Sequence, residues 1–434
     1  MTVALRTVAR RCLDAALAAV EPERLVRASL RHDDGALVLL DAAGRPCARH
    51  AGPVVVAAAG KAALAMARGA VVGSGVVIVP HGGGGACDGM VVRTAGHPLP
   101  DADGERATAE LLAIVAAAPS DALVLVLLSG GASALLVAPA PGVTLDDKRA
   151  ITARLLAAGA DIASINAVRR HCSRVKGGGL ARAAGGAAAC WALVLSDVVG
   201  DDPSVIASGP TVADPTTFAE AAAVLARYLP PGAVPAGVRA RLADGIAGRV
   251  PETPKPGDPL LARVRTCIVA GNRTAVAAAA EAARAQGFAP EIVDAPLLGD
   301  ATEAGRAVVA RLETLPRDRP VALVLGGETT VRVAAGGHGG RSQQLALSAA
   351  VALAGRSGLV LAAGTDGVDG PTDAAGACVD GATVERARRR GIDARDALER
   401  TDSHPALDAA GDLLRTGPTG TNVADLVVVV RDAC

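Results

Sequence analysis

Continuous apolar runs, rather than alternating ones, dominate the hydrophobic pattern along the chain. Runs of this kind suit strands that are covered on both faces, as in a parallel sheet. Ala-rich segments with helical spacing lie between many of them, for example residues 62–67, 105–118 and 274–286. Strands that alternate with helices predict an α/β doubly wound architecture. The predicted strands are residues 54–58, 76–79, 123–128, 192–195, 266–269, 321–325, 359–362 and 426–430.

The length of the chain and one proline-rich region predict two domains. A chain of 434 residues is too long for one ordinary core. Proline is concentrated at residues 229–232 and again at 251–259, with a short helical segment between these stretches. We therefore predict an N-terminal domain over residues 1–250 and a C-terminal domain over residues 260–434.

Composition and charge exclude several classes of function. Two Phe, one Trp and one Tyr leave almost no aromatic faces on which bases could stack, and the formal net charge is zero. Nucleic-acid binding is therefore disfavoured. The eight cysteines form no C-x-x-C pair, which disfavours zinc, a redox motif and a disulfide framework and indicates a reducing, cytoplasmic setting.

Two segments resemble targeting or membrane signals, and we interpret both otherwise. Residues 5–20 have helical spacing, and Asp14 among the arginines favours an amphipathic helix over a transit peptide. Residues 122–145 carry no charge, but glycines and prolines interrupt them. That segment is predicted to be a buried strand, a glycine turn and a short helix, so no membrane partner is expected.

Most of the polar, glycine-rich loops follow predicted strands, where open α/β sheets bind their ligands. The first contains Gly60 and Lys61. It is not a Walker A loop, because no Gly lies five residues before Gly60 and Ala62 replaces the Ser or Thr. The lysine can meet an anion at the start of the next helix, or it can be a solvated residue of an ordinary turn.

Two further loops suggest phosphate binding. Ser129, Gly130, Gly131 and Ser133 offer backbone N–H groups and two hydroxyls at a predicted helix start, which suits a phosphate cradle. A basic stretch leads into Lys176, Gly177 and Gly178 and can balance triphosphate charge, or it can be a solvated helical face; its other members are Arg169, Arg170, His171 and Arg174. His97 is predicted to fix a loop shape rather than to act in catalysis.

Acidic residues at strand ends suggest a Mg²⁺ site, because magnesium is held by one or two carboxylates together with water and phosphate oxygens. Asp197 and Asp202 follow one predicted strand, and Asp366 and Asp369 follow another. Asp202 can also be a simple turn residue, and Asp366 or Asp369 can also serve as a base. The sequence leaves the ligand set open among these four.

The C-terminal half contains one more loop with candidate chemistry. Gly326, Gly327 and Glu328 follow a predicted strand, and Arg341 begins a helix after a second glycine run. An arginine at that position can bind a carboxylate or phosphate through two parallel hydrogen bonds. No G-x-S-x-G elbow is present, and no full G-x-G-x-x-G fingerprint follows the first strand, which disfavours serine hydrolysis and weakens a nicotinamide enzyme.

Taken together, these loops resemble the class II glycerate 2-kinases, whose C-terminal domain is called MOFRL. The resemblance runs over essentially the whole chain, and its most specific stretches are residues 165–180, 195–217, 337–347 and 364–373. It implies an N-terminal Rossmann-like domain and a C-terminal MOFRL-type α/β domain, with the active site in the cleft between them. It implies an enzyme that transfers the ATP γ-phosphoryl group to the 2-hydroxyl of D-glycerate.

The resemblance also assigns roles to residues. The proposed catalytic lysine of the family matches Lys61, and the arginine of its G-G-R-N-Q-E motif matches Arg341. In this chain Ser342 replaces the Asn and Gln344 the Glu, so a carboxylate role at Gln344 is in doubt. ATP and Mg²⁺ are the implied cofactors, D-glycerate is the small-molecule partner, and a homo-oligomer is compatible with the sequence. Because some relatives are called hydroxypyruvate reductases, an NAD(P)H-dependent reductase is the alternative.

The residues expected to bind the nucleotide are Ser129, Gly130, Gly131, Ser133, Lys176, Gly177, Gly178, Gly326, Gly327 and Glu328. Those expected to bind the metal are Asp197, Asp202, Asp366 and Asp369.

Overall fold

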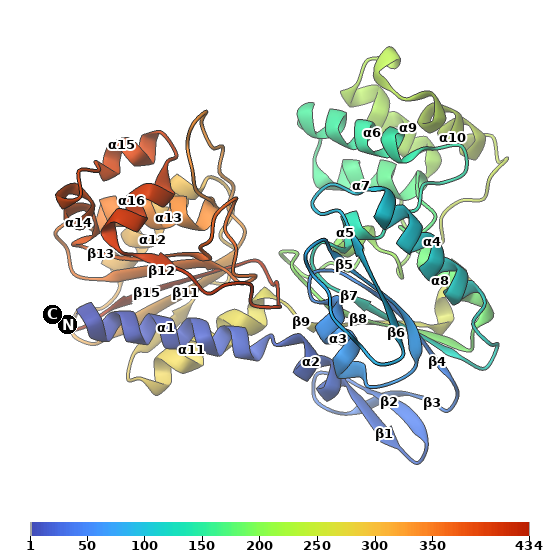
Figure 1. Cartoon of the computed structure of the whole chain (residues 1–434), viewed down its shortest axis with the longest axis horizontal. Coiled ribbons are helices and arrows are strands. Elements are labelled where there is room, and N and C mark those ends of the chain that lie inside the picture. Colours follow the sequence, from blue (N-terminus) through green and yellow to red (C-terminus); the bar gives the residue numbers. More distant parts are fainter. Residues whose placement is uncertain (1, 434) are drawn as a thin grey trace. The chain divides into compact units, whose positions relative to one another are not determined.

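The computed structural model describes residues 2–433, which form two compact units (Figure 1). The N-terminal unit comprises residues 22–196 and 200–269, and the C-terminal unit comprises the segment up to Glu21, residues 197–199 and everything from Ala270 onward. The predicted change of domain at residues 250–260 therefore differs from the structure in two ways. The first helix belongs to the C-terminal unit, and residues 260–269 belong to the N-terminal unit.

A six-stranded sheet with the order β6-β5-β4-β7-β8-β9 forms the centre of the N-terminal unit. Its pairs β5/β6, β4/β5, β4/β7 and β7/β8 are parallel, as the continuous apolar runs predicted. The strands are β4 (Val54–Ala59), β5 (Ser74–Pro80), β6 (Met90–Ala95), β7 (Leu123–Leu128), β8 (Ala189–Leu195) and β9 (Val264–Ala270). The helices between them are α3 (Ala63–Ala70), α4 (Ala102–Ala116), α5 (Ala132–Leu135), α6 (Leu145–Ala157), α7 (Ile162–His171) and α8 (Gly179–Ala183).

Two additions complete this unit. A small antiparallel sheet, which the sequence did not reveal, follows a short helix; these elements are α2 (Pro22–Ser29), β1 (Leu30–Asp33), β2 (Ala36–Leu40) and β3 (Pro46–His50). Helices α9 (Phe218–Tyr228) and α10 (Ala236–Ile246) pack with α6 and α7 around the buried Phe218. Thr217 and Glu220 form a capping box that starts α9, which satisfies backbone N–H groups at the helix start.

The C-terminal unit contains a mixed six-stranded sheet with the order β10-β11-β15-β12-β13-β14. Strand β15 runs antiparallel to both of its neighbours, β11 and β12, whereas the sequence predicted parallel strands. An apolar run shows that both faces are covered but does not encode strand direction. The strands are β10 (Ala289–Ile292), β11 (Val321–Gly327), β12 (Leu359–Gly364), β13 (Gly376–Asp380), β14 (Leu413–Leu414) and β15 (Asp425–Arg431).

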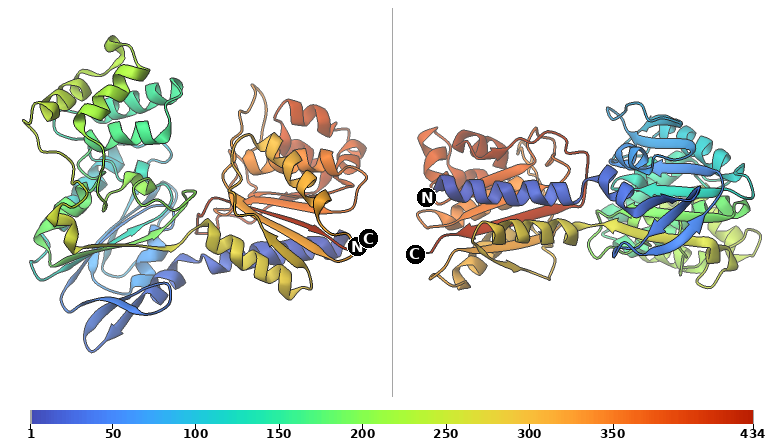
Figure 2. Two further views of the ribbon diagram at one scale, coloured as in Figure 1. Left: turned by 180° about the vertical axis from the view of Figure 1, so that it is seen from behind. Right: turned by 90° about the horizontal axis from the view of Figure 1, so that it is seen from below.

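Helices cover both faces of this sheet (Figure 1). One face carries α1 (Thr2–Ala19) and α11 (Asn272–Ala285), which lie side by side in both views of Figure 2. The other face carries α12 (Ala301–Thr314), α13 (Arg341–Leu353), α14 (Thr383–Arg389), α15 (Ala394–Glu399) and α16 (Ser403–Ala410). Their contact residues are mostly Ala, Val and Leu, which lets helices and sheet approach closely.

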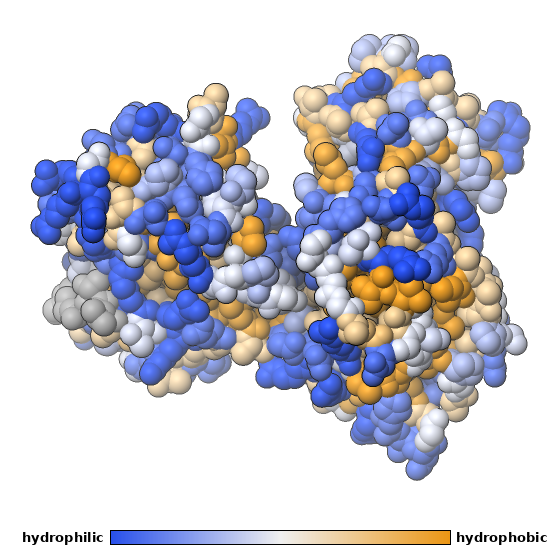
Figure 3. Space-filling view, in the orientation of Figure 1, coloured by the Kyte–Doolittle hydropathy of each residue, from blue (hydrophilic) through white to orange (hydrophobic). Residues whose placement is uncertain are grey.

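Buried aliphatic residues fill both units, while charged and polar residues spread over the surface that Figure 3 shows. Residues 122–145 contain β7, a glycine turn and α5, as predicted. None of the helices in the described part of the chain has the length and apolar character needed to cross a membrane.

A set of ion pairs attaches the first helix to the C-terminal unit. The Arg6 guanidinium donates to the Cys378 carbonyl at 2.7 Å and to the carboxylates of Asp380 at 2.5 Å and Asp412 at 2.8 Å. Both carboxylates are almost fully buried, and Arg386 binds them as well. Arg6 therefore neutralises charge that the fold has removed from water.

We predict that Arg6→Leu lowers the free energy of unfolding by about 1–3 kcal/mol, because charge-assisted hydrogen bonds to buried carboxylates are lost. Arg10→Leu on the same helix is the matched control. Its partner Asp14 is exposed, so its loss should cost less than about 1 kcal/mol. Urea denaturation followed by circular dichroism measures both, and equal effects of the two substitutions would contradict the assignment.

Candidate functional site

The loop that carries Lys61 is tied to the loop at the end of β7. The Lys61 N–H donates to the Gly130 carbonyl at 2.8 Å, and the Ala62 N–H donates to the Ser129 hydroxyl at 3.0 Å. A Cβ on Gly60 would lie 2.1 Å from the Ser129 Oγ, and the φ of Gly60 is +134°. Glycine is thus required where the two loops touch. The carboxyl ends of the parallel strands β4 and β7 hold Lys61 and Ser129 together.

Gly131 lies between Lys61 and His97. Its φ is +83°, and a Cβ there would lie 2.9 Å from the His97 Cδ2 and 3.6 Å from the Lys61 Cγ. The His97-Pro98 peptide bond is cis. We call Lys61, His97, Ser129 and Gly131 the lysine cluster. It combines a half-buried ammonium group with an imidazole and a hydroxyl at the end of a parallel sheet.

Lys176 is buried and points at Ser133. Its ammonium group donates to the Ser133 carbonyl at 2.7 Å and to the Ser133 hydroxyl at 3.1 Å, and the Ser133 hydroxyl lies 3.1 Å from that of Ser208. Burial lowers the pKa of Lys176 well below its usual value, and the positive charges of Arg169 and Lys148 act in the same direction. The side chain therefore joins two loops.

The glycines after Lys176 use their N–H groups in the same way. Gly177 donates to the Ser208 carbonyl at 3.0 Å, and Gly178 donates to the Gly209 carbonyl at 2.7 Å. The nucleotide-binding role expected of Lys176, Gly177 and Gly178 therefore needs correction. Their donors are occupied by the segment that carries Ser208, so they support the loop of Ser133 rather than present free donors to a ligand.

In the C-terminal unit, strand pairing gathers charged residues at one edge of the sheet. Asp425 begins β15 and lies opposite Gly327 at the end of β11 and opposite Gly364 at the end of β12. Because β15 is antiparallel to both neighbours, its first residue meets the last residues of β11 and β12. Sequence reasoning missed Asp425, since the antiparallel direction of the last strand cannot be read from its apolar run.

Arg341, the first residue of α13, reaches this edge. Its Nε and Nη2 donate to the two oxygens of Asp425 at 2.7 Å and 3.0 Å, and its Nη1 donates to Glu328 at 2.5 Å. We call Arg341, Glu328 and Asp425 the arginine cluster. The two parallel bonds to Asp425 fix the plane of the guanidinium group, as a bidentate pair does.

Charge in the arginine cluster is out of balance toward the negative. Burial raises the pKa of Asp425 to about 7, the charges of Asp369 and Glu328 add to this rise, and Arg341 opposes it. Burial by itself would lower the pKa of Arg341, but Asp425, Glu328 and Asp369 together raise it. Several carboxylates thus surround one guanidinium group. Their excess negative charge can be neutralised by a further cation.

Asp369 caps α13, so its predicted role as a metal ligand needs correction. Its two oxygens accept from the N–H groups of Ser342 at 3.0 Å and Gln343 at 2.8 Å, and the Gln343 side-chain amide donates to it as well. Burial raises the pKa of Asp369, while these hydrogen bonds and Arg341 oppose the rise. Its carboxylate is committed to holding the helix start that presents Arg341.

The other predicted metal ligands, Asp366, Asp197 and Asp202, belong to two different units. Asp366 lies at the charged edge, since a Cβ on Gly364 would be 3.3 Å from its Oδ1 and 3.7 Å from the Oδ1 of Asp425. Asp197 accepts from the Asn422 amide at 3.3 Å within the C-terminal unit. Asp202 lies in the N-terminal unit, where its Oδ1 accepts from the Ser204 N–H at 2.8 Å, which makes it a turn residue.

Gly326 and Gly327 permit close packing rather than ligand binding. A Cβ on Gly326 would lie 1.6 Å from the Asn272 Oδ1, and one on Gly327 would lie 2.2 Å from the Leu297 carbonyl oxygen. The Asn272 amide in turn donates to the carbonyl of Asp425 at 2.9 Å. Of the predicted trio, only Glu328 takes part in the charged edge, through its ion pair with Arg341.

Fold and site define an α/β protein with two groups of charged residues at strand ends, an arrangement typical of enzymes that act on small anionic molecules. Residues 8–243 match the family described as a domain of unknown function, DUF4147, and residues 321–425 match the MOFRL family.

Full-length relatives agree with these matches. The chain is 39% identical to a glycerate 2-kinase of Pyrococcus horikoshii over 98% of this chain and 97% of that one. It is 43% identical, over 99% and 95% of the chains, to an Agrobacterium vitis protein whose name assigns it only provisionally to hydroxypyruvate reductases. The crystal structure of the Thermotoga maritima glycerate kinase superposes with a TM-score of 0.84 at 37% identity, covering 99% of both chains. The chain belongs to the MOFRL family of glycerate 2-kinases.

We predict that Gly131→Ala destabilises the protein by at least about 1 kcal/mol more than Gly142→Ala does, because it adds overpacking against His97 to backbone strain. Gly142 is the matched control, since its φ is +82° and nothing lies within 4 Å of a Cβ there. Its substitution should cost only the strain of the left-handed conformation, about 1–2 kcal/mol. Thermal unfolding measures the difference, and equal losses would show that His97 does not pack against this turn.

Proposed function

We propose that the chain is a glycerate 2-kinase that uses ATP and Mg²⁺ to phosphorylate the 2-hydroxyl of D-glycerate. The observation that carries this proposal is the arginine cluster, an oriented guanidinium among carboxylates, in a chain that matches a glycerate 2-kinase over nearly its full length. Phosphoryl transfer needs positioning and charge neutralisation more than it needs covalent chemistry. Oriented charged groups at the ends of strands meet that need.

Arg341 is suited to hold an anion in a fixed direction. Of its five N–H groups, three donate to Asp425 and Glu328, which leaves one on each terminal nitrogen for a substrate. These two can bind the glycerate carboxylate or the phosphoryl group as its charge develops. Asp425 and the cap from Asp369 keep the guanidinium in place while it does so.

Lys61 supplies a second cation, in the N-terminal unit. Its half-buried side chain passes beside the turn of Gly130 and Gly131, whose backbone and whose neighbour Ser129 can hold phosphate oxygens. A positive charge at that position stabilises the phosphoryl group in transfer. The roles of Lys61 and Arg341 can be exchanged without changing this chemistry.

The charged edge of the C-terminal unit fits a magnesium ion. Asp366 offers a carboxylate oxygen there, while Asp425 and Glu328, which accept hydrogen bonds from Arg341, add negative charge that exceeds the charge of that one arginine. Magnesium takes one or two protein carboxylates and completes its shell with water and phosphate oxygens, so a larger set of protein ligands is not required. When bound, the ion would neutralise phosphate charge. We propose Asp366 as its protein ligand, with Asp197 as the next candidate.

The hydroxypyruvate reductase alternative lacks the sequence feature that it needs. The turn after β4 reads Ala59-Gly60-Lys61-Ala62, without the G-x-G-x-x-G that lets a dinucleotide pyrophosphate approach the backbone.

The seven described cysteines are free thiols, which supports the reducing compartment, the cytoplasm, that we propose for this enzyme.

We predict that Lys61→Ala and Arg341→Lys each lower kcat/KM for D-glycerate by about 10²–10³-fold, as removal of an oriented charge or donor does. Arg332→Ala is the matched control, because Arg332 is exposed on the loop before α13. The assay follows glycerate-dependent ADP release, with NADH oxidation by hydroxypyruvate measured in parallel. Full activity in both site variants would refute the site, and NADH turnover without ADP release would favour the reductase.

We also predict that kcat/KM falls as the pH is lowered through about 7, because protonation of Asp425 weakens its hold on Arg341. The pKa of this carboxyl is raised, so its ionised form prevails only above that pH. In Asp425→Asn the residue cannot titrate, and activity should be lower but nearly constant across this range. An acidic limb that is the same in the variant would assign the titration to another group.

A further inference from the structure

A second basic site lies inside the N-terminal unit, and its lining residues are different from those of the lysine cluster. A cavity of about 340 Å³ opens between the end of α7, the loop after it, α8, α10 and residues 251–254, which is a size that suits a small molecule. No Asp or Glu is among the described residues that line it. Its basic lining residues are Arg170, His171, Arg174, Lys176, Arg182 and Arg241.

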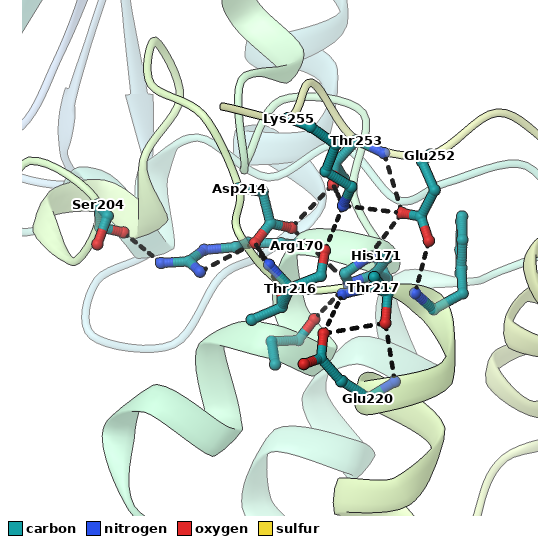
Figure 4. A network of polar contacts seen from close by, with 12 residues as sticks. Arg170, His171, Ser204, Asp214, Thr216, Thr217, Glu220, Glu252, Thr253 and Lys255 are labelled. Atoms are coloured by element: carbon teal, nitrogen blue, oxygen red, sulfur yellow. Dashed lines mark hydrogen bonds and ion pairs between the residues drawn. The ribbon is translucent and has the colours of Figure 1, made fainter. Parts of the chain in front are cut away.

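The carboxylates of Asp214 and Glu252, beside this cavity, already accept hydrogen bonds from other residues. Asp214 accepts from Arg170 at 3.1 Å and from the hydroxyls of Thr216 at 2.6 Å and Thr253 at 3.0 Å (Figure 4). Glu252 accepts from Lys255 at 3.0 Å, from the Phe218 N–H at 2.9 Å, and contacts the imidazole of His171 at 3.1 Å. These two acids pair with Arg170 and Lys255, so they do not neutralise the remaining arginines.

Three arginines at the cavity have no carboxylate partner among the described residues. Arg182 donates to the backbone carbonyl of Glu252, and Arg241 donates to the carbonyl of His171 at 3.4 Å while lying over the Phe218 ring. Arg174 is exposed, and no hydrogen bond or ion pair of its side chain occurs within residues 2–433. Asp244, the nearest acid on α10, pairs with Arg249 instead.

Two observations show that hydrogen-bond donors and positive charge at this cavity are not fully satisfied. Arg170 is only 6% exposed, yet its Nε has no hydrogen-bond partner in the described structure. Burial lowers the pKa of Arg241 and the positive charge of Arg182 lowers it further, while Cys172 and Asp244 oppose the change. An unpaired buried donor and facing like charges are both costly, and an anion in the cavity would relieve both.

We propose that this cavity binds a small metabolite through a phosphate monoester group. Guanidinium groups match phosphate geometry with paired N–H donors, and a dianionic phosphate fits several uncompensated arginines better than a monoanionic carboxylate does. The cavity exceeds the needs of phosphate alone, and apolar side chains such as Leu112 and Pro254 lie beside it to contact the organic part. The inference does not depend on the proposed kinase reaction.

Inorganic phosphate is the first probe, titrated into the full chain by calorimetry. Arg174→Gln, whose side chain has no bond to lose, and Arg241→Gln should each weaken binding by about tenfold or more, since a charge-assisted contact to phosphate is removed. Arg239→Gln, exposed on the same helix as Arg241, makes the same change of charge outside the cavity and should leave the affinity unchanged. Equal affinity in all three variants would overturn the proposal.

The catalytic residues supply the second comparison. Arg341→Lys should retain phosphate binding, and Arg174→Gln should retain the wild-type kcat in phosphate-free buffer with an unchanged melting temperature. Phosphate binding that is lost in Arg341→Lys but kept in Arg174→Gln would place the anion at the charged edge and refute the cavity. AMP and glycerol 3-phosphate then separate a nucleotide from a phosphorylated three-carbon ligand. At least one should displace phosphate, and displacement by neither would contradict a metabolite site.

Discussion

The pairing of Arg341 with Asp425 is the constraint on which the charged edge of the C-terminal unit depends. Asp425 is the first residue of β15, and its position between the last residues of β11 and β12 requires the antiparallel direction of that strand. Arg341 is the first residue of α13, whose start is held by Asp369. A bond between two side chains 84 residues apart thus depends on the whole order of the sheet. Reversing β15 would remove the carboxylate that orients the guanidinium group.

Incomplete neutralisation of charge is a feature that the charged edge and the basic cavity share. At the charged edge, carboxylates outnumber the one arginine, and burial raises the pKa of Asp425, with a further rise from the charges of Asp369 and Glu328. At the basic cavity the reverse holds, because Asp214 and Glu252 are committed and three arginines remain. Unneutralised charge inside a protein costs free energy. It is typical of sites where a bound ligand of opposite charge neutralises it. The edge is therefore suited to a cation, and the cavity is suited to an anion.

The sequence predicted the apolar strands well and their surroundings less well. All eight predicted runs are strands, because burial on both faces leaves a direct trace in composition. The direction of a strand, the sheet it joins and the helices it packs against leave no such trace. Residues 266–269 and the first helix were therefore assigned to the wrong unit. Asp425 was missed because the direction of the last strand could not be predicted. Lys61, Ser129 and Arg341 do lie at strand ends or helix starts. Lys176 and Asp369 could not be told from ligand-binding residues, since their partners come from distant loops.

The most direct test of the account is the identity of the product. Purified protein is mixed with ATP, Mg²⁺ and D-glycerate, and any phosphoglycerate is identified by ³¹P and ¹³C NMR. We predict 2-phosphoglycerate together with an equal amount of ADP. Formation of 3-phosphoglycerate, or no phosphorylated product from a folded protein, would contradict it.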